Sequence, residues 1–205
     1  IYSGLVVGGE VPRYLDNMTH RYQEAPSSVF ESALTLESAF KEDLMKRNGG
    51  ENVHKLHDEL AEALVKNVTV VRNNEDLAKT LAFIKLIEKR YQNIRIDDHT
   101  PFLNQTYAFA NQFRYMIEVA KIITKGALLR DESRGSHYKK EFPHRDDKNW
   151  LKTTIAKYDP NKDEPVITYK TVDVRHLDPV NRNYTKTKKV QPELKNIPNN
   201  IKLPL

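Results

Sequence analysis

Residues 75–91 read EDLAKTLAFIKLIEKRY, and their apolar members return every three or four positions. Such spacing places the apolar side chains on one stripe of a helix, with two acidic residues in the favourable first turn. The inner face should contain Leu77, Leu81, Ile84, Ile87 and Tyr91. A helix with one apolar stripe has to bury that stripe against another element. The stretch therefore predicts a helical bundle whose other members lie in neighbouring segments.

Two flanking segments repeat the pattern. In the first, Glu51 is expected in the first turn of a helix with one apolar stripe, which contains Val53, Leu56, Leu60, Leu64 and Val68. The longest pattern begins near Asn104 and runs towards Arg130, with the inner positions Tyr107, Ala110, Phe113, Ile117, Ala120 and Ile123. Three long amphipathic helices can bury one another. The fold class expected is mainly α, with a three-helix, spectrin-repeat-like bundle.

Shorter signals precede the bundle. Ser28 followed by Glu31 matches a capping box and predicts a helix up to Arg47, which the sequence Asn48-Gly49-Gly50 should stop. Residues 1–9 carry two glycines four positions apart, which suits close packing of a buried helix against another element. That first, shorter helix is expected to end or kink near Pro12.

After Gly135 the helical period is lost. Residues 152–158 and 166–174 are rich in Thr, Val, Ile and Tyr and flank the turn-like sequence of residues 159–163. This pattern predicts a small β-hairpin. From Thr185 onward the chain is basic and proline-containing, and we expect an extended, flexible C-terminal tail.

Composition narrows the class of protein. The 205 residues are 39% hydrophobic and 30% charged, which is typical of globular proteins that fold in water. The chain has no cysteine, so disulfides, thiolate zinc sites, iron–sulfur ligation and cysteine nucleophiles are excluded. Its apolar runs fall short of the roughly 20 residues that cross a bilayer. The net charge of +5 is a weak argument for nucleic acid, because 28 acidic residues are spread among 33 basic ones.

The densest cluster of reactive side chains lies between Arg130 and Lys152. It contains Glu132-Ser133-Arg134-Gly135-Ser136-His137-Tyr138, then Phe142-Pro143, then Arg145-Asp146-Asp147. This run resembles the C-terminal signature of the succinate dehydrogenase and fumarate reductase flavoproteins, and L-aspartate oxidase has a related version. The likeness extends to about Lys188 and includes Gly49-Gly50-Glu51-Asn52 and residues 169–174.

Two positions depart from that family's pattern. Ser136 stands where the family usually has Ala, and Thr153-Thr154 stands where it commonly has His-Thr. The second departure argues against an essential proton transfer at position 153.

The resemblance implies a division of labour within a longer subunit. In this family FAD is held by an N-terminal dinucleotide-binding fold, and His and Arg residues upstream of this chain grip the substrate. The parent oxidises succinate to fumarate, or the reverse, and passes electrons to an iron–sulfur subunit and a membrane quinone. This chain has no Gly-x-Gly-x-x-Gly after a strand. We therefore expect it to be inactive alone, with no catalytic, cofactor-binding or metal residues of its own.

The resemblance also implies partners and boundaries. Expected partners are the flavin-binding domain of the same subunit, the iron–sulfur subunit and, indirectly, the membrane anchor, with no nucleic acid, at the cytoplasmic face of the inner (cell) membrane. Residues 1–24 should be the trailing helix of the missing flavin-binding domain, and its exposed glycine face would favour self-association of the piece. Residues 25–135 should form the bundle domain, residues 136–184 the signature loop and hairpin, and residues 185–205 the flexible basic tail.

Two roles are open for the signature. Arg134 and Arg145 offer forked donors that suit carboxylates, and Asp131, Glu132, Asp146 and Asp147 are close in sequence. One role is a network that ties the helix end to the hairpin and to the flavin domain. In the other, Arg134 and His137 orient the flavin or an active-site arginine. The structural or supporting residues are Glu132, Ser133, Arg134, Gly135, His137, Arg145, Asp146 and Asp147.

Parts of the sequence also suggest three other functions. Ser133 and Ser136 near His137 could suggest a hydrolase, but no Gly-x-Ser-x-Gly elbow is present. His54 and His57, with Glu51 or Asp58, could hold a metal, although their spacing is not that of common zinc sites, and surface histidines are expected instead. The basic residues 175–195 leave the alternative of a free-standing helical module that binds nucleic acid or protein.

Overall fold

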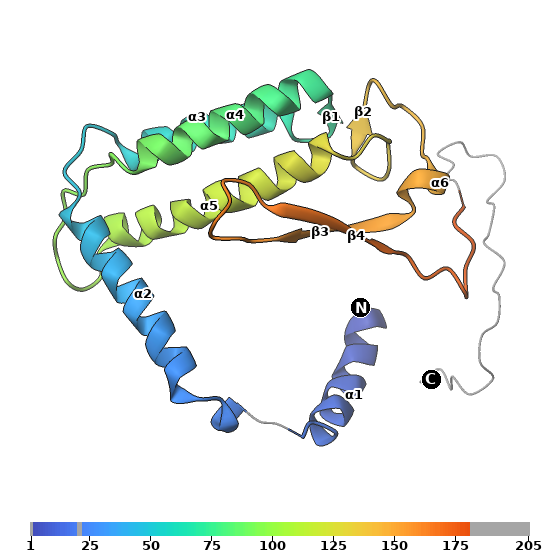
Figure 1. Ribbon diagram of the computed structural model, residues 1–205, viewed down its shortest axis with the longest axis horizontal. Coiled ribbons are helices and arrows are strands. Elements are labelled where there is room, and N and C mark those ends of the chain that lie inside the picture. The colour runs from blue at the N-terminus through green and yellow to red at the C-terminus, as the bar shows by residue number, and fades with distance from the viewer. Residues whose placement is uncertain (1, 20–21, 181–205) are drawn as a thin grey trace. The chain divides into compact units, whose positions relative to one another are not determined.

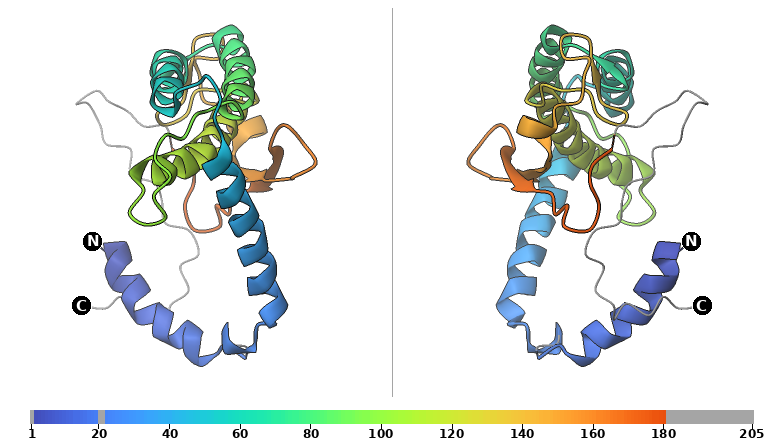
Figure 2. Two further views of the ribbon diagram at one scale, coloured as in Figure 1. Left: turned by 90° about the vertical axis from the view of Figure 1, so that its left-hand side faces the viewer. Right: turned by 90° about the vertical axis from the view of Figure 1, so that its right-hand side faces the viewer.

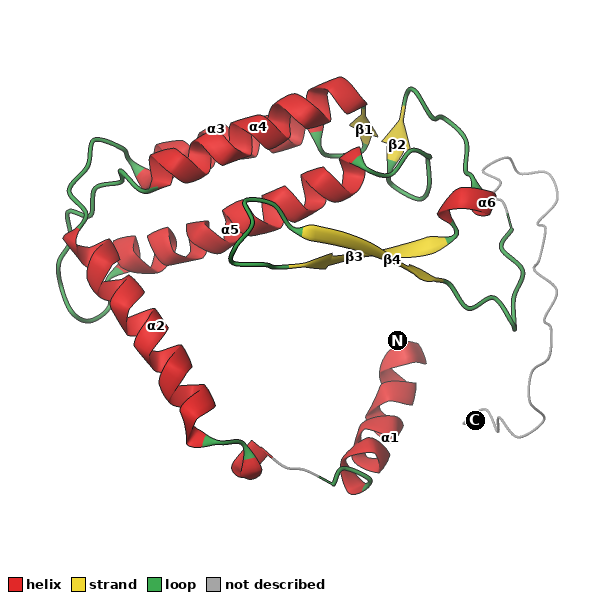
Figure 3. Cartoon of the chain, viewed as in Figure 1, coloured by secondary structure: helices red, strands yellow, loops and turns green. Residues whose placement is uncertain are grey.

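A computed structural model describes residues 2–19 and 22–180 of the chain (Figure 1). The described part is mainly helical, with two small two-stranded sheets (Figure 3). Its helices are α1 (Tyr2–Asp16), η1 (Tyr22–Glu24), α2 (Ser27–Lys46), α3 (Val53–Asn67), α4 (Asn74–Tyr91), α5 (Gln105–Leu128) and α6 (Asp147–Trp150). Its strands are β1 (Val71–Arg72), β2 (Tyr138–Lys139), β3 (Lys152–Lys157) and β4 (Val166–Thr171). The predicted fold class is confirmed, and the predicted tail at 185–205 lies outside the described residues.

The chain divides into two compact units. One comprises residues 1–49 and 96–107, and the other residues 50–95 and 108–205. The second unit contains α3, α4, most of α5, both sheets and the signature. The domain boundaries expected from the sequence, including the bundle at 25–135, stay predictions.

The core of the second unit is the bundle of α3, α4 and α5. Figure 2 shows α3 and α4 as a pair, with α5 running beside them. The apolar stripes predict this core well, since the side chains buried in it are Val53, Leu56, Leu60, Val68, Leu77, Leu81, Ile84, Ile87, Tyr91, Ala110, Phe113, Ile117 and Ala120. Burial of complete apolar side chains contributes about 1.5–3 kcal/mol each, so this core is the main source of stability in the unit.

One inner position on α5 is predicted wrongly. Ile123 is 49% exposed, whereas Lys121 and Thr124 are buried. The 3.6-residue period carries the inner stripe from Ile117 through Lys121 and Thr124, which leaves Ile123 about 100° away. Lys121 can be buried because its Nζ donates to Glu88 Oε1 at 2.5 Å and to Glu118 Oε1 at 3.0 Å. The polar residue on the apolar stripe therefore forms an ion pair that joins α5 to α4.

The start of α3 also differs from the prediction. Glu51 is not in the first turn, because Asn52 caps the helix and its side chain accepts the backbone N–H groups of His54 and Lys55. Asn is among the preferred N-cap residues. Glu51 instead pairs through its backbone with the segment after α4 and accepts from Arg90 Nε at 2.8 Å. The residue therefore joins α3 to the end of α4.

The first unit begins with α1, which continues through Pro12 to Asp16, so the helix does not end at Pro12. The alternative of a kink at Pro12 stays a prediction. Proline removes the hydrogen bond to the carbonyl of Gly8. That loss is tolerable because the described side chains of α1 are all exposed, and water can reach the carbonyl. The sequence predicted a buried helix, but none of the described residues covers α1.

The capping box predicted for α2 is wrong as well. The helix begins at Ser27 after Pro26, and no side chain caps it. Ser28 lies inside the first turn, where its carbonyl accepts from Ser32 Oγ at 2.6 Å. Proline beside a helix start supplies a suitable φ without needing a partner for an N–H group. This feature replaces the serine cap.

The predicted hairpin is confirmed. Strands β3 and β4 pair antiparallel from Lys152↔Thr171 to Lys157↔Val166. Along β3 half-buried residues alternate with exposed ones, as expected when one face lies against α5. Lys125 on α5 donates to the carbonyl of Pro165 at 2.9 Å, which fixes the hairpin beside that helix. The short parallel pair β1–β2 and the helix α6 were not predicted.

Candidate functional site

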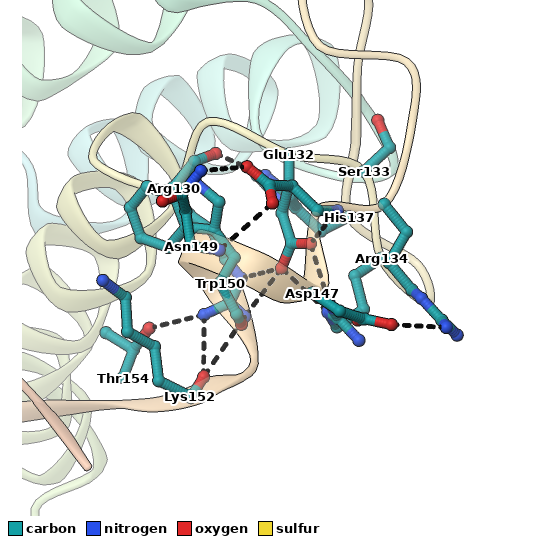
Figure 4. Close-up of polar contacts among 12 residues, drawn as sticks. Arg130, Glu132, Ser133, Arg134, His137, Asp147, Asn149, Trp150, Lys152 and Thr154 are labelled. Atoms are coloured by element: carbon teal, nitrogen blue, oxygen red, sulfur yellow. Dashed lines mark hydrogen bonds and ion pairs between the residues drawn. The ribbon is translucent and has the colours of Figure 1, made fainter. Parts of the chain in front are cut away.

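The signature folds between the end of α5 and the start of the hairpin, and Figure 4 shows its polar contacts. It opens with a tight turn in which the Arg134 amide donates to the His137 carbonyl at 2.8 Å and the His137 amide donates back at 3.0 Å. Gly135 has a φ of +61°, and Ser136 after it keeps a negative φ. This is the pattern of a two-residue hairpin turn that favours glycine at its first central position. The sequence needs Gly135 for the shape of the backbone.

Replacing Gly135 with Ala should therefore lower the free energy of unfolding by about 1 kcal/mol, because an L residue with a side chain is strained at positive φ. A Cβ at this position would meet nothing within 4 Å, so crowding adds no further cost. Gly135→Asn should lose less, since Asn tolerates this conformation. Urea unfolding followed by circular dichroism measures both. Equal losses for Ala and Asn would contradict the conformational explanation.

Glu132 is the centre of the site and is fully buried. One carboxylate oxygen accepts from Arg130 Nε at 2.9 Å and Arg134 Nε at 2.8 Å, and the other accepts from Arg134 Nη2 at 2.9 Å and the Asp146 amide at 3.0 Å. Burial by itself would raise the pKa of Glu132. The hydrogen bonds from Arg134, the Asp146 amide and Arg130 outweigh that effect and lower the pKa. Glu132 is therefore held as a buried carboxylate.

Asp147 extends the network to a second arginine. Arg134 Nη2 donates to Asp147 Oδ1 at 2.6 Å, and Arg145 Nη2 donates to Asp147 Oδ2 at 2.6 Å. Arg145 Nη1 also donates to the carbonyl of Val180 at 2.6 Å. Burial would raise the pKa of Asp147, but the bonds from Arg134 and Arg145 lower it. Charges thus alternate in sign from Glu132 to Arg145.

Asp146 holds α6 in place. Its Oδ1 accepts the Asn149 amide at 3.1 Å, and its Oδ2 accepts Asn149 Nδ2 at 2.7 Å. These bonds cap the helix, and together they lower the pKa of Asp146. Because the Asp146 amide binds Glu132, the cap and the buried carboxylate position each other.

Ser133 and Lys139 form the other side of the loop. Ser133 Oγ donates to the Phe142 carbonyl at 2.7 Å and accepts the Lys139 amide at 3.0 Å. The Lys139 side chain is fully buried, and its Nζ donates to the Leu128 carbonyl at 2.8 Å and to Asp131 Oδ1 at 2.9 Å. Sequence reasoning missed Lys139, because a lysine in a charged loop normally points into solvent.

His137 is neutral in this arrangement. Its Nε2 lies 3.0 Å from the Arg130 carbonyl, which can only accept, so Nε2 carries the proton. Its Nδ1 then accepts from Arg72 Nη1 at 2.5 Å. Burial lowers the pKa of His137, and the positive charges of Arg72, Lys139 and Arg130 lower it further. The ring acts as a bridge between β1 and the end of α5.

The chain should lose stability as the pH falls below 6.5, the ordinary pKa of histidine. His137 binds its proton at a lower pH in the folded state than in the unfolded state, so acid favours unfolding in that window. Chemical unfolding at pH 7 and pH 5 measures the loss, which should shrink in His137→Gln. His144→Gln, exposed on the same loop, is the control and should leave the loss unchanged. An identical loss in His137→Gln would contradict this assignment.

Arg130 was outside the predicted set, yet its guanidinium makes the most contacts in the site. Besides Glu132 it donates to Thr154 Oγ1 at 3.1 Å, to the Trp150 carbonyl at 2.7 Å and to the Lys152 carbonyl at 3.2 Å. It also lies 5.4 Å from the centre of the Trp150 ring. Arg130 therefore joins the end of α5 to α6 and β3. The sequence contains one indication of this role for Arg130, which is that the residue directly precedes the acidic pair Asp131-Glu132.

Other predicted groups do not converge on a site. Ser133 Oγ is committed to backbone groups and Ser136 is exposed, so neither is paired with His137 as a nucleophile with its base. His54 stacks on the Phe109 ring with centres 4.4 Å apart. Within residues 2–19 and 22–180, no group of three potential ligands is placed to hold a metal ion.

Comparisons with known proteins agree with the signature. A family model described as the fumarate reductase flavoprotein C-terminal region matches residues 57–184. The succinate dehydrogenase flavoprotein subunit of Bacillus subtilis is 40% identical over 188 residues, which cover 92% of this chain and 32% of that protein. The fumarate reductase flavoprotein subunit of Haemophilus influenzae is 31% identical, covering 70% of this chain and 24% of that protein. The chain thus spans a quarter to a third of these relatives.

Solved structures give the same result. A variant of E. coli quinol fumarate reductase superposes with a TM-score of 0.72 and 26% identity, covering 77% of this chain and 27% of that one. A quinol-fumarate reductase determined with menaquinol molecules gives a TM-score of 0.67 and 27% identity, covering 73% of this chain and 26% of that one. These relatives give no support to the nucleic-acid alternative.

Proposed function

The chain belongs to the family of succinate dehydrogenase and fumarate reductase flavoprotein C-terminal domains, and from this premise we propose that it braces such a subunit without doing chemistry itself. The complete subunit would interconvert succinate and fumarate with FAD and pass electrons to an iron–sulfur subunit and a quinone. The chemistry would be carried by the part of the subunit that this chain does not contain. The role of the present chain is then to hold its neighbours in place.

The observation that carries this proposal is the closed ion network around Glu132. Both carboxylate oxygens accept two hydrogen bonds, and all four come from residues 130–146 of this chain. A buried carboxylate whose lone pairs are occupied in this way serves as a structural anchor. Arg130 links Glu132 to the hairpin through a hydrogen bond to Thr154. Arg145, which is joined to the network through Asp147, donates to the carbonyl of Val180. The signature therefore connects segments of the domain.

FAD does not fit the signature. Its pyrophosphate would need unpaired cations or a helix N-terminus with free N–H groups. Arg134 is paired with Glu132 and Asp147, and Arg145 is paired with Asp147. We infer that the flavin is held by another part of the subunit.

The exposed surfaces of the first unit indicate which partners this chain would contact. Helices α1 and α2 expose apolar side chains that a protein in water normally covers, namely Leu5, Val7, Leu15, Phe30, Leu34 and Leu36. We propose that the flavin-binding domain of the same subunit covers these faces. The chain alone would then self-associate through them. Contact with the iron–sulfur subunit completes the proposed set of partners.

The cellular location is part of the same proposal. No helix in the described segments combines the length and apolar character that crossing a bilayer requires. We propose peripheral attachment at the cytoplasmic face of the membrane, where the other subunits of the complex would provide the link to the anchor.

A chimera tests the proposed function. The matching C-terminal segment of the Bacillus subtilis subunit is replaced by this chain, and the purified protein is assayed for flavin absorbance and succinate oxidation. We expect the chimera to keep both, while the 205-residue chain mixed with excess FAD keeps no flavin bands after desalting. A chimera that folds but cannot load flavin would contradict the proposed bracing role. Flavin retained by the chain alone would contradict the proposed division of labour.

Arg134→Ala in the chimera should lower flavin content and activity together. The substitution removes bonds to Glu132 and Asp147 and should cost about 1–3 kcal/mol per charged group left without its partner. The flavin-to-protein ratio, read from the visible and ultraviolet spectra, measures the effect. Arg175→Ala is the control, because the ion pair of Arg175 in the described part of the chain is with exposed Asp173. If Arg134→Ala keeps its flavin content, the network around Glu132 has no influence on the flavin domain, which would contradict the proposed bracing role.

A further inference from the structure

A cavity of about 270 Å³ lies between α5 and the hairpin, next to the signature. Helix α5 contributes Ile122 and Ile123, and the hairpin contributes Thr154 and Ile167. Arg130, which follows the end of α5, lines the cavity together with Arg72 and His137. None of the lining residues is acidic. The cavity therefore combines apolar walls with a basic corner.

Arg72 is the unusual member of this corner. Its Nε donates to the Val68 carbonyl at 2.9 Å, and its Nη1 donates to neutral His137. Neither partner carries a negative charge, and no ion pair of Arg72 is present among the described residues. Burial lowers the pKa of Arg72, as expected for a partly desolvated cation without a counter-ion. A half-buried charge is normally paired, and residues 2–19 and 22–180 supply no counter-ion to Arg72.

The other polar groups of the corner do not supply the missing charge. Arg130 is paired with Glu132, and its guanidinium also donates to Thr154 of the hairpin and to the Trp150 carbonyl of α6. Thr154 Oγ1 accepts from Arg130, so its own hydroxyl hydrogen remains available as a donor. Arg72 and Thr154 both line the cavity, and each keeps a donor group that no hydrogen bond among the described residues uses. Both suit an oxygen that carries negative charge.

We propose that this cavity binds the carboxylate group of a short aliphatic monocarboxylate. Arg72 would pair with the carboxylate, and the methylene groups would lie against Ile122, Ile123 and Ile167. A phosphate has no apolar part for those walls, and a dicarboxylate would press its second charge against them. The volume is below the roughly 300–1,000 Å³ of pockets for drug-sized ligands, which suits a small acid. This site lies beyond the proposed function and does not depend on it.

Two sources present the same chemical group. One is a free small acid, and the other is an Asp or Glu side chain of a neighbouring domain that packs over the cavity. The two are distinguished by comparing the chain alone with the chimera, in which the rest of the subunit is present.

The first experiment titrates butyrate into the ¹⁵N-labelled 205-residue chain at constant ionic strength. We expect saturable shifts at Arg72 Nε and at the amides of His137 and Thr154. Arg72→Met should weaken binding about tenfold or more, as expected for the loss of a charge-assisted hydrogen bond. Arg175→Met removes the same charge at an exposed position and should leave binding unchanged. Thr154→Val is a milder second variant that should also weaken binding, and it covers the case in which Arg72→Met does not fold.

The chimera then identifies the source. Saturable binding of butyrate to both proteins supports a free acid as the ligand, and binding to the chain but not to the chimera supports a side chain of the covering domain. Absence of saturable shifts in the chain, or equal affinity in wild type, Arg72→Met and Thr154→Val, would overturn the proposal. Because the titration uses no flavin, its failure is separate from failure of the proposed function.

Discussion

Replacing Glu132 with Gln will lower the free energy of unfolding by about 3–5 kcal/mol, the cost of breaking a buried ion pair by removing one partner. The amide is close to the carboxylate in shape, so the change removes charge and one acceptor oxygen without opening a cavity. Arg130 and Arg134 then keep their charges beside a neutral group. The Gln NH₂ group also faces donors, which adds an unsatisfied contact.

The unfolding of Glu132→Gln can be followed in the region of the network, because the chain has a single tryptophan. Trp150 lies at the edge of the network, with its carbonyl bound to Arg130, so its fluorescence reports unfolding of this region in urea. Glu75→Gln is the matched control: it removes the same charge from an exposed pair with Lys79 and should change stability by less than about 0.5 kcal/mol. A loss for Glu132→Gln as small as that of the control would contradict a structural role for the buried carboxylate.

The pH dependence of the same variant provides an independent check. The pKa of Glu132 is lower in the folded state than its ordinary value of 4.5. Its contribution to stability is therefore complete above about pH 4.5 and is lost as the pH falls through the folded-state pKa. Wild type should lose stability over this range more steeply than Glu132→Gln. Parallel curves for the two proteins would show that the carboxylate is not the group responsible.

Periodicity was enough to predict the bundle because its helices are long. Every apolar residue expected on the inner face of α4 is buried, and the stripe of α3 fails only at Leu64, which is partly buried. The prediction of the inner face fails where a buried polar residue interrupts the apolar pattern. On α5 the buried Lys121 breaks the hydrophobic pattern, and Ile123 was placed inside in its stead. The ion pairs that make Lys121 acceptable come from another helix, so the local sequence does not contain them.

Helix ends and the signature depended on contacts from distant parts of the chain. Asn52 rather than Glu51 starts α3, because Glu51 is recruited by Arg90 on α4. The pairing of β1 with β2 joins segments more than sixty residues apart, and two-residue strands have no period of their own. The signature was located by resemblance, whereas its central roles for Arg130 and Lys139 required the geometry. Their backbone acceptors, such as the Leu128 carbonyl, leave no trace in residue type.

Replacing Phe113 with Ala should destabilise the bundle by about 3–5 kcal/mol, since a large buried ring is removed and the surrounding helices relax only partly. Phe113 is completely buried on α5, where its ring meets Tyr91 of α4 edge-on at 6.0 Å and His57 of α3 at 5.9 Å. Phe113 therefore contacts both of the other helices of the bundle.

Val119→Ala on the same helix is the matched control for Phe113→Ala. Val119 is 52% exposed, so its truncation should change the free energy of unfolding by less than about 0.5 kcal/mol. Circular dichroism follows the helices, and Trp150 fluorescence follows the signature. If α3, α4, α5 and the signature form one cooperative unit, Phe113→Ala will shift both transitions to the same lower urea concentration. A shift in the helical signal alone would mean that the network around Glu132 holds the hairpin without the bundle, and the bracing role would then belong to the signature by itself.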